Sequence, residues 1–403
     1  MIDAHLRDLA GRSPALRELL DATEQEQQES GYEHTLREIC QQPSTWPATA
    51  ATTALRSGAL GAALEGVQAL VFTGSGSSLY AGECLVPVLA GDLRIPAEAI
   101  GGGDILTRGA ARIPPLQPCL VVSLARSGDS PESCAAVDLL LSTEPACRHL
   151  AITCNAKGRL AMNYLRTPGF RSLVLDGRTN DRSLVMTSSF TNMVLAGRAL
   201  GMLGRMDAWR ATVDRLADAA REIIPGHADA LAGAARRGFR SAVYLASWMR
   251  FGAAREAALK MLEMTAGRIH TFPETFLGLR HGPMSSVHED TAVVCFLSSA
   301  ATARAYELDL IRELDRKELG AFKVVAGEKI PDDILRPGDI AVNYPEGLAD
   351  GDTPVLDVVV GQLLAFFRCR AEGLRPDAPS ESNVITRVVE PFKIHAVPAG
   401  EAQ

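Results

Sequence analysis

The sequence predicts an α/β protein built from two tandem, doubly wound domains, each a parallel sheet with helices on both faces. The chain has 403 residues, enough for two or three domains. Short β-branched segments alternate with Ala- and Leu-rich amphipathic segments, which is typical of βαβ units. The alternation begins near residue 69 and again near residue 241, which indicates a weak internal duplication.

The elements follow from this alternation. Residues 1–45 are predicted to be helical, and the last of these helices is predicted to end at Pro43. The first series predicts strands at 69–73, 119–124, 150–154 and 173–175 and helices at 79–90, 131–141 and 191–203. A long helix at 208–224, stopped by Pro225, leads to the second series. That series predicts strands at 241–247, 291–298, 322–326 and 340–343 and helices at 251–267, 301–319 and 355–372.

Four parts of the chain result from these predictions. They are a helical segment at 1–45, a first domain at 46–215, a second domain at 216–375 and a tail at 376–403. We expect the tail to close over the site.

Composition and charge exclude several classes of protein. Apolar residues make up 47% and charged residues 22%, so disorder is excluded as the main state. No apolar run approaches the roughly 18–20 residues of a membrane span, and the N-terminus lacks the apolar core of a secretory signal. The net charge of −7 argues against a nucleic-acid binder with a broad basic surface. We expect a cytoplasmic protein whose small anionic ligand is bound in a local pocket.

The eight cysteines predict neither disulfides nor a metal site. They are scattered along the chain without a CxxC motif or His-x-His spacing. We therefore expect buried thiols in a reducing compartment and no zinc site. Independently of the cysteines, we expect no organic cofactor and no other metal.

Two Gly/Ser-rich loops predict an anion site in the first domain. The segment 72–82 contains Gly76, Ser77 and Ser78, follows a strand and opens a helix, but matches neither a dinucleotide motif nor a Walker motif. Its glycines, free helix N–H groups and hydroxyls suit an anion, although a tight turn with a serine cap explains it equally well.

The second loop, at 123–133, strengthens this prediction. It carries Arg126, Ser127 and Ser130 just before Pro131. Parallel strands place both loops at one sheet edge, where these groups converge on one phosphate. A hydroxyl-rich site of this kind fits a sugar phosphate better than a nucleotide.

A third group of polar residues lies on the helix predicted at 251–267. Glu256, Lys260 and Glu263 have the i, i+4, i+7 spacing of one helix face. A solvated ion-pair ladder is the alternative. Arg-His-Gly-Pro at 280–283 follows closely and favours a functional face.

These segments together resemble the sugar-isomerase (SIS) domain family. The sequences GSGSS and ARSGDSPES resemble its two phosphate-binding loops, and the double domain resembles the isomerase half of glucosamine-6-phosphate synthase. The resemblance is closer to the D-galactosamine-6-phosphate deaminases, also described as tagatose-6-phosphate ketose/aldose isomerases. Further matching segments, in the same order, are 35–43, 181–192, 255–267, 278–283 and 383–389.

The resemblance implies roles for four residues. Glu263 is the base that moves a proton between C1 and C2, and a partly buried carboxylate suits this step. His281 opens the sugar ring. Lys260 polarises the site or holds Glu263, and Arg387 stands where the synthase has a lysine that reaches the substrate.

The resemblance also implies a further contact loop, and some segments depart from the family. Thr187 and Ser188 resemble a sugar- or phosphate-contacting loop, with a helix N-cap as the alternative. In 245–252, Trp248 and Met249 would crowd an anion, so we expect no second phosphate there. The segments 269–276 and 283–286 are also atypical and line the expected sugar site, which leaves the substrate's identity open.

The expected activity is conversion of D-galactosamine 6-phosphate to tagatose 6-phosphate and ammonia. A plain ketose/aldose isomerase, a glucosamine-6-phosphate deaminase and a non-catalytic sugar-phosphate-binding regulator are the alternatives. The resemblance also implies a homodimer or higher homo-oligomer, in which His281 can serve a neighbouring subunit.

Overall fold

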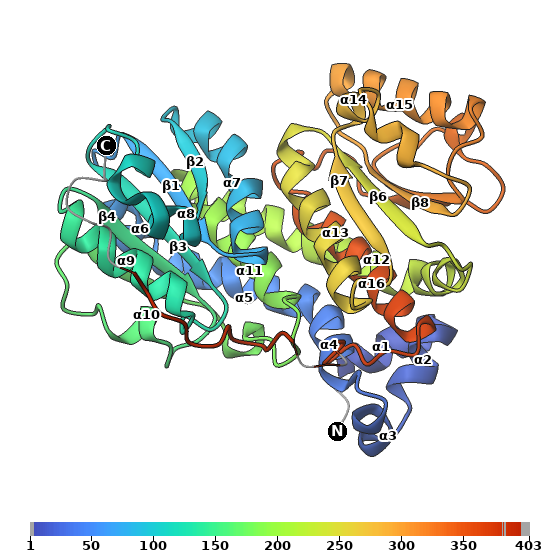
Figure 1. The fold of residues 1–403 in the computed structure, drawn as a ribbon, viewed down its shortest axis with the longest axis horizontal. Helices are drawn as coiled ribbons and strands as arrows, with labels where there is room; N and C mark the ends of the chain where they lie inside the picture. The colour runs from blue at the N-terminus through green and yellow to red at the C-terminus, as the bar shows by residue number, and fades with distance from the viewer. Residues whose placement is uncertain (1–3, 381, 383, 396–403) are drawn as a thin grey trace. The chain divides into compact units, whose positions relative to one another are not determined.

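The computed structural model describes residues 4–380, 382 and 384–395. Asn383 of the last matching segment, and residues 381 and 396–403 of the predicted tail, lie outside the described residues. The chain forms two compact units (Figure 1). Unit 1 takes the described residues of 1–43, 182–187 and 215–384, and unit 2 takes those of 44–181, 188–214 and 385–403.

Unit 2 is built on a five-stranded parallel sheet with the order β2-β1-β3-β4-β5. Its strands are β1 (Ala69–Gly74), β2 (Ala97–Gly101), β3 (Cys119–Ala125), β4 (Arg148–Thr153) and β5 (Phe170–Val174). Every residue of β1 and β3 is buried, as expected for inner strands covered on both faces. Its helices are α6 (Ser57–Leu64), α7 (Ser77–Leu93), α8 (Gly102–Arg108), α9 (Pro131–Thr143), α10 (Arg159–Met162) and α11 (Ser188–Arg198).

Unit 1 holds the second parallel sheet, with the order β10-β9-β8-β6-β7. Its strands are β6 (Ser241–Ala246), β7 (His270–Glu274), β8 (Thr291–Phe296), β9 (Phe322–Gly327) and β10 (Ile340–Asn343). Its helices are α1 (Ala4–Arg12), α2 (Pro14–Leu20), α3 (Glu24–Glu29), α4 (Glu33–Cys40), α13 (Phe251–Met264), α14 (Phe276–Leu279), α15 (Ala301–Arg316) and α16 (Pro354–Ala371). Helices α5 (Gln42–Leu55) and α12 (Met206–Ala235) contain unit boundaries.

The two sheets have the same topology, which confirms the predicted tandem α/β fold. Read from its other edge, the second sheet has the order β7-β6-β8-β9-β10, so each strand corresponds to one in β2-β1-β3-β4-β5. Strand β8 therefore corresponds to β3, and β6 to β1. Short 3-10 turns complete the fold at Gly109–Arg112, Gly177–Thr179, Ala199–Arg205, Trp248–Arg250, Pro283–Ser286 and Asp332–Ile334.

Helices α13 and α16 of unit 1 pack very closely. A Cβ atom added at Gly361 of α16 would lie 2.5 Å from the Cβ of Ala257 on α13. Only glycine permits this approach, which fixes the position of α13 against the sheet.

Two helix ends that were predicted from proline residues are wrong. Pro225 lies inside α12, which runs unbroken to Ala235, because buried Ile224 and Leu231 anchor the helix on both sides of the proline. Pro43 falls in the first turn of α5, where a missing N–H costs little, and the preceding helix already ends at Cys40.

Two of the four edge strands of the sheets, β2 and β7, were not predicted. Each pairs with one neighbour only, so its residues are partly exposed and lack the continuous apolar run of an inner strand. Pro273 is tolerated in β7 because an edge strand does not need every N–H for pairing.

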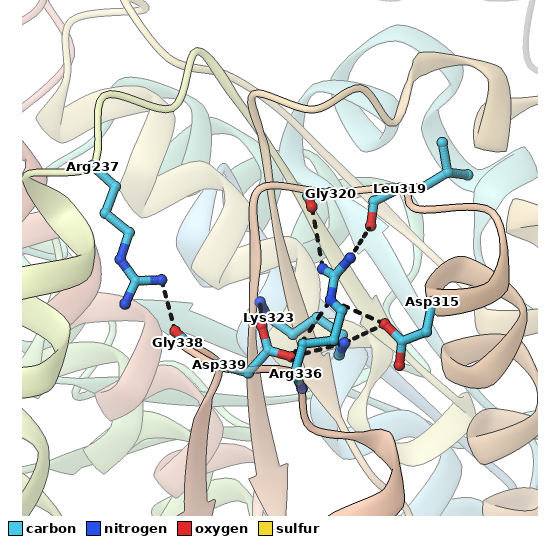
Figure 2. A network of polar contacts seen from close by, with 8 residues as sticks. All are labelled: Arg237, Asp315, Leu319, Gly320, Lys323, Arg336, Gly338 and Asp339. Carbon is cyan, nitrogen blue, oxygen red and sulfur yellow. Dashed lines mark hydrogen bonds and ion pairs between the residues drawn. The ribbon is translucent and has the colours of Figure 1, made fainter.

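A buried ion network joins β9 to the turn before β10 (Figure 2). Lys323 is 1% exposed, and its Nζ lies 2.8 Å from Asp339 and also pairs with Asp315. Arg336 adds a 3.2 Å contact to Asp315, and the Lys323 N–H donates to Asp339 over 2.6 Å. The network lies at the amino ends of these parallel strands, so we interpret it as a structural tie between β9 and β10.

Candidate active-site residues

The two Gly/Ser loops of unit 2 lie at one edge of its sheet. Strands β1 and β3 are adjacent and parallel, so the loops that follow them begin side by side. Gly76 has φ +57°, in the region that favours glycine, and lets the chain turn directly into α7. Ser77 and Ser78, the first two residues of that helix, are buried.

The loop between β3 and α9 carries unoccupied hydrogen-bonding groups. The Ser127 Oγ accepts the Asp129 N–H over 3.2 Å, and Asn155 donates to the Ser127 carbonyl over 2.9 Å. Within the described part of the chain, the buried Oγ of Ser130 in this loop has no hydrogen-bond partner, and neither has the buried Oγ1 of Thr73 in the adjacent strand β1. Such groups at a loop edge suit a ligand that supplies oxygen acceptors.

Arg126 connects this loop to the C-terminal segment of unit 2. Its Nη2 donates to the Arg387 carbonyl over 2.5 Å. Arg387 in turn donates to the Asp181 carbonyl and to the Asn180 side chain, each over 2.7 Å. Arg387 thus lies beside the predicted phosphate loop, and its role toward a substrate stays a prediction.

Asp181 organises the start of α11. Its fully buried carboxylate accepts the Ser188 hydroxyl over 2.5 Å, the Ser189 hydroxyl over 2.5 Å and the Ser189 N–H over 2.9 Å. The Asp181 carboxylate therefore caps α11 through the Ser189 N–H, the Ser188 hydroxyl donates to the same carboxylate, and the adjacent Thr187 is fully buried. Sequence reasoning missed Asp181; its signal was an acidic residue shortly before two serines that open a helix.

The polar face of α13 is largely buried. Lys260 is 1% and Glu256 0% exposed, and Lys260 Nζ lies 3.3 Å from Glu256 Oε1. It donates to Glu263 Oε2 over 2.5 Å, while Glu263 is 26% exposed. The spacing prediction is confirmed, and this burial rules out the solvated ladder.

The charge of Lys260 follows from its two partners. Burial is the largest influence and acts to lower its pKa, but the carboxylates of Glu256 and Glu263 together raise that pKa above its ordinary value. Lys260 is therefore a fixed cation that orients the Glu263 carboxylate.

His281 lies in an exposed turn after α14 of the same unit. Its N–H donates to the Gly278 carbonyl over 2.9 Å, and Arg280 anchors the turn by donating to Glu313 over 2.8 Å. In the residues that the structure describes, no hydrogen bond joins the His281 ring to Glu263, so the ring-opening role of His281 stays a prediction.

The cysteines and helices of the described residues offer neither a metal site nor a membrane span. Among the described residues, no group of three or more His, Cys, Asp or Glu side chains could hold a metal ion. The eight cysteines are free and buried. None of the helices in this part of the chain combines the length and apolar character needed to span a bilayer.

The chain is similar to proteins of one family over most of its length. An AgaS protein of Streptomyces coelicolor is 39% identical over 375 residues, covering 90% of this chain and 96% of the relative. The D-galactosamine-6-phosphate deaminase AgaS of Escherichia coli is 35% identical over 328 residues, covering 81% and 85%. The chain belongs to the AgaS family. No family model matches it.

Solved structures agree with membership of the AgaS family. Tagatose-6-phosphate ketose/aldose isomerase from Escherichia coli has a TM-score of 0.82 and 31% identity, covering 91% of this chain and 97% of that one. The C-terminal domain of glucosamine-fructose-6-phosphate aminotransferase from Francisella tularensis, at 16% identity and a TM-score of 0.73, shows the shared fold. The predicted resemblance to sugar-phosphate isomerases and deaminases is confirmed, and this AgaS-family chain is an enzyme acting on sugar phosphates.

Proposed function

We propose that this protein converts D-galactosamine 6-phosphate and water to tagatose 6-phosphate and ammonia. The observation that carries the proposal is the buried Lys260 held against Glu263 on α13, in a chain 35% identical to a D-galactosamine-6-phosphate deaminase. A partly exposed carboxylate fixed by a buried cation has the properties of a positioned general base.

The substrate's phosphate is bound by the two loops of unit 2. The residues proposed for this role are Gly76, Ser77, Ser78, Arg126, Ser127 and Ser130. The unpartnered Ser130 hydroxyl and the helix N-terminus of α7 support it, because both offer donors to an oxyanion. Thr187, Ser188 and Arg387 are also proposed to contact the substrate.

The reaction combines proton transfers with the addition of water and the loss of ammonia at C2. His281 opens the ring, and Glu263 removes the proton from C2 of the open-chain aldehyde, giving an enolamine. Glu263 returns the proton to C1, which leaves an imine at C2. Water adds to C2 and ammonia departs, so the ketose phosphate carries the oxygen of that water. Lys260 keeps the Glu263 carboxyl group oriented between the two transfers.

Glu263→Gln tests the assignment of the base. We expect ammonia release from D-galactosamine 6-phosphate to fall by about 10²–10⁴-fold, because the amide cannot accept the C2 proton. Binding of the substrate, measured calorimetrically, should persist. Glu24→Gln, the same change at an exposed position of α3, is the control. A Glu263→Gln enzyme with the full rate would refute the assignment.

A plain ketose/aldose isomerase is the second candidate, because a solved relative carries that name. The two candidate reactions differ only in whether the substrate carries an amine at C2, which is released as ammonia. Parallel assays with galactosamine 6-phosphate, glucosamine 6-phosphate and tagatose 6-phosphate separate them: ammonia from the first substrate supports the deaminase, and aldose formation from tagatose 6-phosphate without ammonia release from either amino sugar supports the isomerase. A regulator would bind these sugars without turnover.

We also propose that the enzyme works in the cytoplasm as a homo-oligomer whose subunits share sites. If His281 serves a neighbouring subunit, mixing inactive Glu263→Gln and His281→Ala proteins should restore part of the activity. Absence of restoration in a mixture shown to exchange subunits would contradict shared sites.

A further inference from the structure

The loop after β8 in unit 1 repeats the geometry of the predicted phosphate loop after β3 in unit 2. The two strands occupy corresponding places in their sheets. A serine stands two residues beyond each strand, Ser298 and Ser127. Each Oγ accepts the N–H of the residue two positions later, from Ala300 over 3.1 Å and from Asp129 over 3.2 Å. Both loops then open a long helix, α15 and α9.

The two loops differ in what occupies them. In unit 1, the Asp350 carboxylate accepts the Ser298 hydroxyl and, over 2.7 Å, the Ser299 N–H. In unit 2, no acceptor within the described residues takes the Ser127 hydroxyl proton, and the Ser130 Oγ has no partner. One loop is therefore filled by a carboxylate of the chain itself, whereas the other is open.

Cationic groups stand around the filled loop. Arg304 of α15 donates from Nε to the Ser298 carbonyl over 2.6 Å, and its buried Nη2 lacks a hydrogen-bond partner in the described part of the chain. Arg250 is 2% exposed and lines a small cavity together with Ser299 and Asp350, and it pairs with Asp357 over 2.8 Å. Without Asp350, the Ser298 hydroxyl and the Ser299 N–H would lose their acceptor, while the Ser298 N–H would keep the Glu307 carboxylate, 2.8 Å away.

We infer that the β8–α15 loop is a second oxyanion loop of the duplicated fold and that the Asp350 carboxylate is its built-in ligand. A carboxylate and a phosphate present the same kind of oxygen acceptors to a hydroxyl and a backbone N–H. Asp350 therefore prevents phosphate from binding in unit 1. The inference goes beyond the proposed function, although the comparison with unit 2 rests on that function's phosphate loop.

Equilibrium dialysis with radiolabelled inorganic phosphate tests this. Asp350→Ala should bind one phosphate per chain more than the unaltered protein. Asp350→Asn is the matched control: its amide oxygen still accepts the Ser299 N–H and fills the space, so its count should not change. Ser298→Ala in the Asp350→Ala background should remove the additional phosphate, which locates it in this loop.

The measured quantity is the difference between variants, so it does not depend on the unit 2 site. If the proposed phosphate site in unit 2 is wrong, the unaltered protein binds no phosphate, yet Asp350→Ala still gains one. A folded Asp350→Ala protein that binds no more phosphate than Asp350→Asn overturns the inference.

Asp350→Ala can also lose stability, because it leaves buried donors unpaired. If it does not fold in chloride, it should refold from urea when phosphate replaces chloride at equal ionic strength. Failure to refold in both salts would likewise overturn the inference.

Discussion

His149 should make unit 2 sensitive to mild acid. This histidine of β4 is 1% exposed and stacks on Phe170 with 6.0 Å between ring centroids. Within the described residues, neither ring nitrogen has a hydrogen-bond partner. Burial lowers its pKa from 6.5 to about 4, because the imidazolium would lose its hydration without gaining a partner.

The sign and size of the effect follow by linkage. Above pH 6.5 the ring is neutral in both the folded and the unfolded chain, so it causes no loss. Between pH 6.5 and 4 only the unfolded chain binds the proton, so the free energy of unfolding decreases as the pH is lowered. A shift of this size corresponds to about 3 kcal/mol in total, of which about 2 kcal/mol is lost by pH 5. Below pH 4 the contribution is constant.

His149→Phe isolates the contribution of His149 protonation to the free energy of unfolding, since phenylalanine also stacks on Phe170 but does not titrate. Urea unfolding at pH 7.5 and 5, followed through hydrogen exchange of the β4 peptide, reports on unit 2. The unaltered protein should lose about 2 kcal/mol more than the variant between the two pH values. His270→Phe, at an exposed position of β7, should behave like the unaltered protein. Equal losses in the unaltered protein and His149→Phe would refute the argument.

Two further predictions concern unit 1. Lys323→Met should lower the free energy of unfolding by about 3–5 kcal/mol, because it leaves the buried Asp339 carboxylate without its ammonium partner; urea unfolding measures this, and a loss below 1 kcal/mol would contradict it. The KM of the Lys323→Met enzyme should not change, since the ion network lies at the amino ends of the strands and the proposed substrate loops lie at carboxyl ends. Gly361→Ala should cost about 1–3 kcal/mol and reduce kcat, because the new methyl group meets Ala257 and displaces the helix that carries Glu263. Gly61→Ala, where a Cβ meets nothing within 4 Å, is the control, and equal effects of the two changes would exclude the packing argument.

The inner part of each sheet could be predicted from the sequence because its strands are buried on both faces. Strands such as β1, β3 and β8 are continuous apolar runs bounded by turn residues, and local composition is enough to recognise them. The edge strands β2 and β7 have no such run, and their pairing with β1 and β6 depends on residues distant in the sequence.

The sequence by itself also determined which segments bring candidate polar residues together. The helical spacing of Glu256, Lys260 and Glu263 depends only on the 3.6-residue period, and the two Gly/Ser loops follow from strand–turn–helix patterns. The acid–base residues of the helix and the hydroxyl groups of the loops could therefore be recognised without a tertiary structure.

The occupancy and burial of these groups were decided by the tertiary structure alone. Whether Lys260 is solvated depends on the packing of α13 beneath α16, and Asp350 reaches Ser298 from a segment 52 residues further along the chain. Each of the loops after β3 and β8 has a serine two residues beyond its strand, but only the fold shows that the Ser298 loop already holds the chain's own Asp350 carboxylate. Contacts between distant residues leave no local pattern, because they arise from how the elements pack and not from the order of residues within any one element.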